Sequence, residues 1–471
     1  MANNILSEQQ VDPAIPAAAA SRELLATIWQ AAGGAFPAVD RVGFSAAGAL
    51  ASVFAVTDLA AASVAAAGLA VSELVSTYGG AAPRVSVDRR RASFWFGTTL
   101  RPVGWQLPPH WDAIAGDYAT ADGWIRLHTN APHHRRAALA VLSVPADKAQ
   151  VAKAVATWQA DALEAAVVEE GGCAAAMRSL QAWRAHPQGS AVAAEPLFAS
   201  TALAGGPVPA WQGTPAQPLA GVRVLDLTRI LAGPVATRFL AGFGADVLRI
   251  DPPGWEEPGQ VPEITLGKRR ARLDLHNPAD RLCFEQLLAQ ADVLVHGYRA
   301  DALERLGYGD AARQALRPGL IDVSLDAYGW TGPWQGRRGF DSLVQMSSGI
   351  AEAGMRLWRR ERPTPLPVQA LDHATGYLLA TAVLRGLTVR ARSGAGCVTR
   401  ASLARTAALL TAAPVLAQGA LKPESADDRA GLIEATAWGP AQRLVPPVLV
   451  AGAPMQWRHP AGQLGNSPAR W

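Results

Sequence analysis

The chain has 471 residues, enough for two or more domains with substantial cores. Its residues are 49% hydrophobic and 17% charged, which is typical of a globular protein and excludes an intrinsically disordered one. The net charge of +4 comes from 43 basic and 39 acidic residues, and so small and scattered an excess argues against a nucleic-acid partner.

Cysteine usage and the N-terminus both favour a reducing, cytoplasmic location. Cys173, Cys283 and Cys397 are far apart and lack CxxC spacing, so neither a disulfide framework nor a metal site is expected. The N-terminus lacks the basic and apolar segments of a signal peptide. The Ala-rich run 59–72 is too short and weakly hydrophobic to span a bilayer, so it is predicted to be a buried helix with no membrane partner.

The first half of the chain divides into three parts. Residues 1–21 are polar and then Ala/Pro-rich, and we expect a flexible N-terminus. The pattern over 22–100 is helical and is expected to complete a larger α/β unit. Residues 101–194 are predicted to form a small α+β domain, in which Asp122-Gly123 marks a hairpin.

The sequence pattern of the second half of the chain predicts a different architecture. Residues 195–217 are rich in Pro and Gly and are typical of a linker. In 218–420 strands alternate with helices, which predicts an α/β fold with a mostly parallel, Rossmann-like sheet covered by helices on both faces. The strands are expected at residues 222–227, 246–250, 271–275, 293–295 and 320–324. Residues 421–471 form a C-terminal tail, and ligands of such sheets bind beyond the carboxyl ends of the strands.

Two distant segments look like copies of one another. Asp58 follows Val56-Thr57, and Asp372 follows Ala370-Leu371. Each aspartate is followed by an apolar, Ala-containing run, a Gly-containing turn and a short segment with β-branched residues. Such a repeat affects the fold assignment and raises the question of which aspartate does chemistry.

The common cofactor motifs GxGxxG, GxxxxGK[ST], GxSxG and HExxH are missing at the expected places. Instead, a series of ordered motifs resembles the class III CoA-transferases, a family that includes formyl-CoA transferase, carnitine CoA-transferase and α-methylacyl-CoA racemases. These motifs lie at 218–234, 244–253, 267–270, 291–295, 303–307, 328–333 and 339–341. The resemblance covers about two hundred residues in the family's order.

The resemblance implies that Asp372 is the catalytic nucleophile. It would attack an acyl-CoA thioester to form a mixed anhydride, and the released thiolate would then produce an aspartyl-CoA thioester that passes CoA to an acceptor carboxylic acid. Acyl-CoA and the acid are thus expected as substrates, with no cofactor bound permanently and no metal. The alternative is that Asp372 simply caps its helix.

The resemblance also implies a set of CoA-binding residues: Arg229, Ile230, Leu231, Ala232, Lys268, Arg269, Tyr298, Arg299 and Arg338. Lys268 and Arg269 match a basic pair that could bind CoA phosphates, or they form a solvated basic turn. His296-Gly297 replaces the family's Glu-Asn, which removes one CoA contact. A cluster at 133–136 is either a solvated surface or a rim for CoA phosphate.

The front half resembles later parts of the same family, which suggests a rearranged tandem of two incomplete units. Because the family forms interlocked dimers, the chain is expected to be an internal pseudo-dimer or a homodimer. Residues 22–215 are then not expected to fold alone. Asp58 lacks the upstream motifs of Asp372 and is interpreted as a relic or a helix cap.

Two alternatives to a transferase stay open. An acyl-CoA racemase or epimerase needs a second proton carrier, but Phe340 stands where the family's racemases have a His. His373 could substitute, although adjacent helical residues point in different directions. A catalytically degenerate CoA-binding protein is the third reading, because fold alone does not determine activity.

Overall fold

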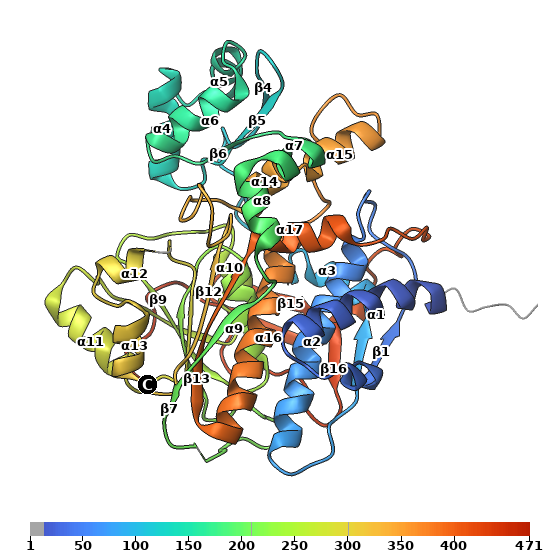
Figure 1. The fold of residues 1–471 in the computed structure, drawn as a ribbon, viewed down its shortest axis with the longest axis vertical. Helices are drawn as coiled ribbons and strands as arrows, with labels where there is room; N and C mark the ends of the chain where they lie inside the picture. Colours follow the sequence, from blue (N-terminus) through green and yellow to red (C-terminus); the bar gives the residue numbers. More distant parts are fainter. Residues whose placement is uncertain (1–13, 209, 300) are drawn as a thin grey trace, which may run out of the picture.

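The computed structural model describes residues 14–208, 210–299 and 301–471 (Figure 1). Its largest element is a seven-stranded sheet with the order β10-β9-β8-β11-β12-β13-β7. The strands are β7 (Ala199–Gly205), β8 (Arg223–Leu227), β9 (Asp246–Asp251), β10 (Lys268–Arg272), β11 (Val293–His296), β12 (Ile321–Asp326) and β13 (Ala395–Ser402). All neighbours are parallel except β7, which runs antiparallel to β13. The expected α/β fold with a mostly parallel, Rossmann-like sheet is confirmed.

Helices cover both faces of this sheet because its strands are apolar on both sides. In β8, Val224 packs into the core beneath α9 (Ala232–Gly242) and α16 (Ala370–Ser393), whereas Leu225 packs into a second core beneath α11 (Pro278–Leu288). Successive strand residues point to opposite faces, and parallel strands buried on both faces are therefore continuously apolar. The helices α12 (Ala302–Arg305) and α13 (Asp310–Leu316) lie on the α11 side (Figure 1).

Two sequence predictions about this sheet were wrong. The third strand is Lys268–Arg272 rather than 271–275, because the basic residues at its start have partners within the fold. The linker assigned to 195–217 contains β7, which closes the sheet at its β13 edge. An edge strand forms half of its backbone bonds, so Gly and Pro around it are tolerated.

The front of the chain forms a smaller version of the same arrangement. It contains α1 (Ala14–Ala31), the 3₁₀ turn η1 (Phe36–Arg41), β1 (Val42–Ser45), α2 (Val56–Thr77), β2 (Val85–Asp88) and α3 (Arg89–Trp95). Strand β2 pairs in parallel with β1 and antiparallel with β16 (Val448–Val450). Residues 14–21 are helical, which corrects the flexible terminus expected over 1–21; residues 1–13 lie outside the described part.

Helices α2 and α16 pack side by side (Figure 1), and they begin with the same turn. The N–H of Val56 donates to the Phe54 carbonyl, and the N–H of Ala370 donates to the Val368 carbonyl, both at 2.8 Å. The central residues have φ −75° and ψ 56° in one turn and φ −75° and ψ 65° in the other. These are the angles of an inverse γ-turn. The two helices therefore share the backbone conformation of the turn that precedes them.

Helix α2 is long and apolar enough to cross a membrane by length and composition, and 89% of its most apolar window is buried inside the protein. A helix that is apolar on all sides is typical of a core position. The prediction of a buried helix over 59–72 is confirmed by the complete burial of Ala61, Ala65 and Leu69.

A small sheet lies at the far end of the molecule from these helices (Figure 1). It consists of β4 (Gly116–Ala119), β5 (Trp124–Leu127) and β6 (Ala174–Ala176), and the predicted hairpin at Asp122-Gly123 joins β4 to β5. The surrounding helices are α4 (Pro132–Leu142), α5 (Lys148–Val155), α6 (Ala160–Glu169), α7 (Leu180–Ala185), α8 (Pro187–Ala194), α14 (Asp341–Ser347), α15 (Ile350–Leu357) and α17 (Leu403–Ala412).

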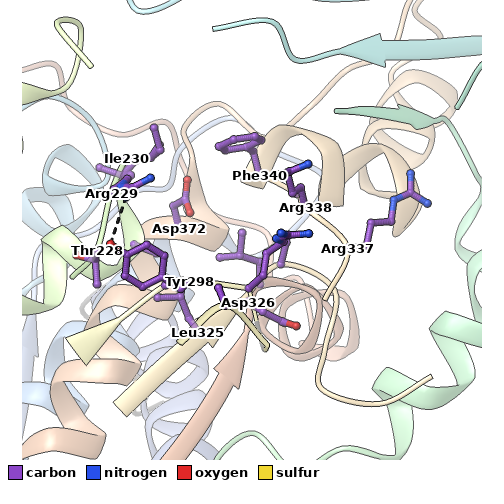
Figure 2. A pocket seen from close by; sticks show the side chains of 18 of the residues that line it. Thr228, Arg229, Ile230, Tyr298, Leu325, Asp326, Arg337, Arg338, Phe340 and Asp372 are labelled. Carbon is purple, nitrogen blue, oxygen red and sulfur yellow. Dashed lines mark hydrogen bonds between the residues drawn. The ribbon is translucent and has the colours of Figure 1, made fainter. Parts of the chain in front are cut away.

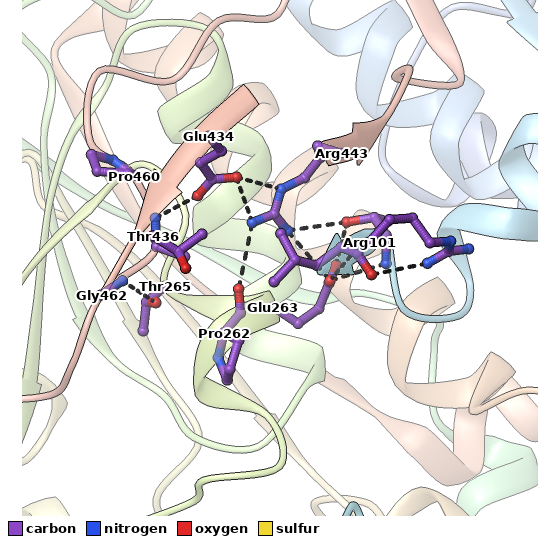
Figure 3. A network of polar contacts seen from close by, with 12 residues as sticks. Arg101, Pro262, Glu263, Thr265, Glu434, Thr436, Arg443, Pro460 and Gly462 are labelled. Atoms are coloured by element: carbon purple, nitrogen blue, oxygen red, sulfur yellow. Dashed lines mark hydrogen bonds and ion pairs between the residues drawn. The ribbon is translucent and has the colours of Figure 1, made fainter. Parts of the chain in front are cut away.

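A buried polar network ties the front of the chain to its end (Figure 3). It joins β3 (Leu100–Pro102), α10 (Val261–Ile264), β14 (Arg429–Thr436) and β15 (Gly439–Leu444), near the 3₁₀ turn η2 (Ala426–Asp428). Glu263 accepts hydrogen bonds from Thr99, and it forms ion pairs with Arg238 and Arg443. Burial alone would raise the pKa of Glu263, but the two guanidiniums outweigh it and lower this pKa to about 2. The front segment is thus tied to the second half through charged contacts as well as strands.

Candidate active site

A cavity of about 380 Å³ opens at the carboxyl ends of β8 and β11. The strand order β10-β9-β8-β11-β12 reverses direction between these two strands, and ligands of open α/β sheets bind at such a point. Most of the lining comes from the turn after β8, the loop after β11, the loop before α14 and the first turn of α16. Further lining residues come from α4, the loop after β9, the end of β12 and the start of α17.

The turn after β8 holds a strained residue. Ile230 has a φ of 66°, a left-handed conformation that is rare for a β-branched side chain. Its N–H donates to the Glu257 Oε2 at 2.8 Å, which helps to hold this conformation. Backbone strain of this kind concentrates at functional sites. The turn leads into α9, whose first residue, Ala232, lines the cavity.

Arg229 lies beside Tyr298 at the cavity (Figure 2) and packs against two aromatic rings. Its guanidinium lies 4.4 Å from the centroid of Trp255 and 5.1 Å from that of Tyr298. It also donates to the Tyr298 hydroxyl at 3.3 Å. Stacking leaves the in-plane N–H groups of an Arg available for an anionic or polar ligand.

Asp372 lies in the first turn of α16 and lines the same cavity, only 6% exposed. The helix comes close to α9 at Gly376, where a Cβ would be 2.5 Å from the Ala232 carbonyl oxygen. This close approach places the start of α16 beside the start of α9. The N-cap of α16 is Gln369, so the alternative that Asp372 caps the helix is wrong.

A second carboxylate adjoins Asp372. Asp341, the first residue of α14, accepts a hydrogen bond from the Asp372 N–H at 2.9 Å and another from Gln345. Burial and the negative charge of Asp341 raise the pKa of Asp372 well above its usual range. Burial likewise raises the pKa of Asp341 to about 6. Among the described residues, no Lys, Arg or His forms an ion pair with Asp372.

The opposite wall of the cavity is basic. Figure 2 shows Asp372 between the Arg229 side and Arg338, which donates to the Gly171 carbonyl at 3.2 Å. Arg299 lines the same wall, and burial together with the nearby Arg338 charge lowers its pKa. Like charges gathered at a cavity favour an anionic ligand. His133, from the 133–136 cluster, also lines this cavity.

The structure brings most of the predicted site residues together. The cavity lining includes Asp372 with Arg229, Ile230, Leu231, Ala232, Tyr298, Arg299 and Arg338. Lys268 and Arg269 are not among them, and their prediction as phosphate ligands is wrong. Lys268 is fully buried and donates to Asp226 and to the Pro234 carbonyl, each at 3.0 Å, while Arg269 pairs with Asp246 at 2.8 Å. Both side chains serve the edge strand β10 and have structural partners.

Asp58 has a different environment from Asp372. It is 1% exposed and pairs with Arg89 at 2.8 Å. It also accepts from Ser21 at 2.7 Å and from Gln418 at 2.9 Å. Its helix is preceded by Ala55 as N-cap, so the interpretation of Asp58 as a helix cap is wrong.

Three contributors to the site were missed from the sequence: Trp255, Glu257 and Asp341 as the neighbour of Asp372. Trp255 and Glu257 follow Pro252-Pro253-Gly254, which predicts a turn but not its direction. Asp341 belongs to a motif already noted at 339–341, yet its bond to the Asp372 N–H depends on the packing of α14 against α16.

Residues 219–443 match the protein-family model described as CoA-transferase family III. This match confirms the resemblance to class III CoA-transferases for this segment of the chain. The match begins just before β8 and includes every element that lines the cavity except α4, which carries His133 and His134.

Curated relatives carry similar names. The chain is 35% identical over 206 residues to the "Probable fatty acyl-CoA transferase Rv3272" of Mycobacterium tuberculosis, covering 40% of this chain and 51% of that protein. It is 32% identical to the "Succinyl-CoA--D-citramalate CoA-transferase" of Chloroflexus aurantiacus, covering 39% and 48%. The chain thus spans about half the length of the curated relatives it matches. A crystal structure of Rv3272 is 35% identical with a TM-score of 0.39, covering 42% of this chain and 57% of that one.

Proposed function

We propose that this protein transfers CoA from an acyl-CoA donor to a carboxylic acid through the side chain of Asp372. The observation that carries the proposal is a buried carboxylate that forms no ion pair with a described Lys, Arg or His and lines the same cavity as Arg229 and Arg338. A carboxylate in that position is available to a substrate, and the basic wall suits the phosphates of CoA.

The proposed reaction balances without a further reactant. An Asp372 oxygen attacks the thioester carbon, and the C–S bond breaks to release CoA thiolate and leave a mixed anhydride. The thiolate attacks the Asp372 carbonyl, which releases the donor acid and forms an aspartyl-CoA thioester. The acceptor carboxylate attacks this thioester to give a second anhydride, and the thiolate then takes the acceptor acyl group and restores Asp372.

The surroundings of Asp372 support this chemistry. Its burial limits water, which would otherwise hydrolyse the anhydride. The start of α9 lies against the cavity at Ala232, and the first N–H groups of a helix have no partner within it. They are available to a carbonyl oxygen that gains negative charge during the attack. A racemase is less well supported because Phe340 carries no proton and His373 does not line this cavity.

Trapping experiments test the proposal. The full-length protein is incubated with labelled acyl-CoA, treated with hydroxylamine and mapped by mass spectrometry. We expect a hydroxamate at Asp372, and we expect Asp372→Asn to lose at least about a thousandfold in transfer rate. Asp58→Asn is the control and should keep the adduct.

Other results of these experiments would support one of the alternative functions or another nucleophile. Exchange of the substrate α-proton with solvent deuterium, without any adduct, would establish a racemase or epimerase. Binding of CoA with neither adduct nor exchange would establish a degenerate CoA-binding protein. An adduct at Asp58 rather than Asp372 would overturn the assignment of the nucleophile.

The internal pseudo-dimer is also a proposal. It is supported by the identical turns at the starts of α2 and α16 and by the pairing of β2 with the C-terminal strand β16. A fragment of residues 22–215 lacks β16 and β13, so we propose that it does not fold alone. A cooperative thermal transition of that fragment would contradict the proposal.

A further inference from the structure

A second cavity, of about 550 Å³, lies on the other side of the first turn of α16. Leu231 lines both cavities. Gln369 and His373, which flank Asp372 in the helix, line the second one, and so does Asp341. Asp372 itself lines the first cavity. The reactive carboxylate is therefore located where the two cavities approach each other.

We propose that the second cavity binds the acyl body of the substrate acid and selects monocarboxylic acids with an apolar body of medium length. This inference rests on the proposed function of Asp372. A thioester whose carbonyl lies at Asp372 has its CoA portion on one side and its acyl portion on the other. The basic first cavity suits the CoA portion, which leaves the second cavity for the acyl portion.

Apolar side chains form part of the wall of the second cavity, with polar and charged residues between them. The apolar ones come from the end of α3, the loop before β4, the turn before α9, α14 and the segment before α16: Phe96, Trp111, Leu231, Met346, Leu366 and Val368. A water-sized group occupies roughly 30 Å³, so this volume has room for roughly eighteen heavy atoms. A one- or two-carbon acyl group would leave most of it empty, and apolar surface gains from contact with a larger acyl chain.

The charges around the cavity disfavour a second carboxylate on the substrate. Arg126 is paired with Asp117 at 2.7 Å and lies 4.7 Å from the Trp111 ring centroid. It also lies close enough to Asp341 to oppose the rise of that carboxyl's pKa. Glu263, which also lines the cavity, is likewise paired, with Arg238 and Arg443. The cation is therefore already matched by carboxylates of the protein, and an added anion would face repulsion.

His373 offers a polar atom to a substituent on the acyl chain. His373 is 3% exposed, and its Nδ1 is buried without a hydrogen-bond partner. Its ring stacks on Phe96 with centroids 5.3 Å apart. Burial lowers the pKa of His373 to about 3, so the ring is neutral near pH 7 and can exchange one hydrogen bond with a hydroxyl or carbonyl group. A neutral imidazole tolerates an apolar chain beside it.

The test fills the cavity without touching Asp372. A Cβ at Gly97, which lines the second cavity, would meet only the Phe94 carbonyl oxygen at 3.4 Å, so Gly97→Leu adds an isobutyl group with little strain. Gly80→Leu is the matched control, because nothing lies within 4 Å of a Cβ there and Gly80 does not line either cavity. Initial rates are compared for hexanoyl-CoA, acetyl-CoA and succinyl-CoA.

We expect the parent protein to prefer hexanoyl-CoA over acetyl-CoA and succinyl-CoA by at least about tenfold in kcat/KM. Gly97→Leu should reduce that preference about tenfold, chiefly by lowering kcat/KM for hexanoyl-CoA, while Gly80→Leu leaves it unchanged. Equal or better use of succinyl-CoA, or an unchanged preference in Gly97→Leu, would overturn the proposal.

A binding measurement separates this proposal from the proposed function. Free hexanoate and free succinate are titrated into the full-length protein and followed by saturation-transfer NMR. Hexanoate binding that is weakened by Gly97→Leu and unchanged in Gly80→Leu supports the acyl cavity even if no transfer is detected. Absence of hexanoate binding, or binding that Gly97→Leu leaves unchanged, contradicts the cavity assignment even if Asp372 forms an adduct.

Discussion

Helices α2 and α16 begin with the same turn and carry an aspartate at the same position, but the two carboxylates have opposite surroundings. Asp58 is matched by Arg89 at 2.8 Å and by hydrogen bonds from Ser21 and Gln418. Asp372 has another carboxylate, Asp341, as its neighbour and lines a cavity. One local structure thus supports two roles, and the groups packed around it decide between them. Asp58 is paired within the fold, whereas Asp372 lines a cavity beside another carboxylate, at a cost in electrostatic energy.

The first prediction concerns the stability of these two sites. Asp58→Asn leaves the buried Arg89 without its counter-charge and should lower the free energy of unfolding by about 3 kcal/mol. Asp372→Asn removes a desolvated carboxylate from beside Asp341 and should raise it by about 1 kcal/mol at pH 7. Urea unfolding of the two full-length variants measures both changes.

The sign for Asp372 follows from its pKa. A raised pKa in the folded state means that folding favours the protonated carboxyl, so the ionised form destabilises the fold as pH rises. The gain in Asp372→Asn should therefore shrink as the pH is lowered. A loss of stability in Asp372→Asn, similar to that of Asp58→Asn, would show that the two sites do not differ in the way described.

The sequence predicted the parts of the fold that depend on local pattern. Strands β8, β9, β11 and β12 are each built around short groups of Val, Leu and Ile, so their positions could be predicted within one or two residues. Strand β7 could not, because its residues are small, lie near Pro and Gly, and form a strand only by pairing with β13, about two hundred residues later. The start of β10 was missed because its charged residues have buried partners elsewhere in the fold.

For the site, too, the sequence predicted the residues that follow from local pattern and missed those that depend on long-range packing. Arg229 and Tyr298 follow the ends of two strands, and the parallel sheet brings these ends together. Lys268 belongs to the same set of motifs, but it is buried against Asp226 under the start of α9. A basic residue in a motif indicates that a charged side chain is present, but it does not indicate whether that side chain faces the cavity or the core. The hydrogen bond from the Asp372 N–H to Asp341 forms only when α14 packs against α16, so the sequence alone does not predict it.

The second prediction tests whether Arg229, at the cavity that Asp372 lines, binds acyl-CoA. Arg229→Gln removes a guanidinium stacked between Trp255 and Tyr298 and should raise KM for acyl-CoA ten- to thirtyfold, with kcat nearly unchanged. Steady-state kinetics at varied acyl-CoA concentration measures this. Arg223→Gln is the control, because Arg223 lies at the other end of β8, 5.7 Å from the Trp471 ring centroid. An equal rise of KM in both variants would indicate a general effect of lost charge.

The third and smallest effect concerns the carboxylate pair itself. The attacking form of Asp372 is ionised, so kcat/KM should rise with pH through an acidic limb that lies above the usual range of an aspartate. Asp341→Asn removes the negative charge beside Asp372 and can still accept a hydrogen bond from the Asp372 N–H. The limb should therefore move to lower pH by about one unit.

A matched control distinguishes the neighbouring charge from any change at a buried carboxyl in the cavity. Asp326 also lines the cavity, and burial raises its pKa well above the usual range, but it has no contact with Asp372. Asp326→Asn should leave the acidic limb in place, since the Gly329 N–H can still donate to the remaining amide oxygen. The two carboxyls of the active-site pair titrate together, so the limb belongs to the pair. If Asp341→Asn and Asp326→Asn shift it equally, the position of Asp341 beside Asp372 is not what sets the pH dependence.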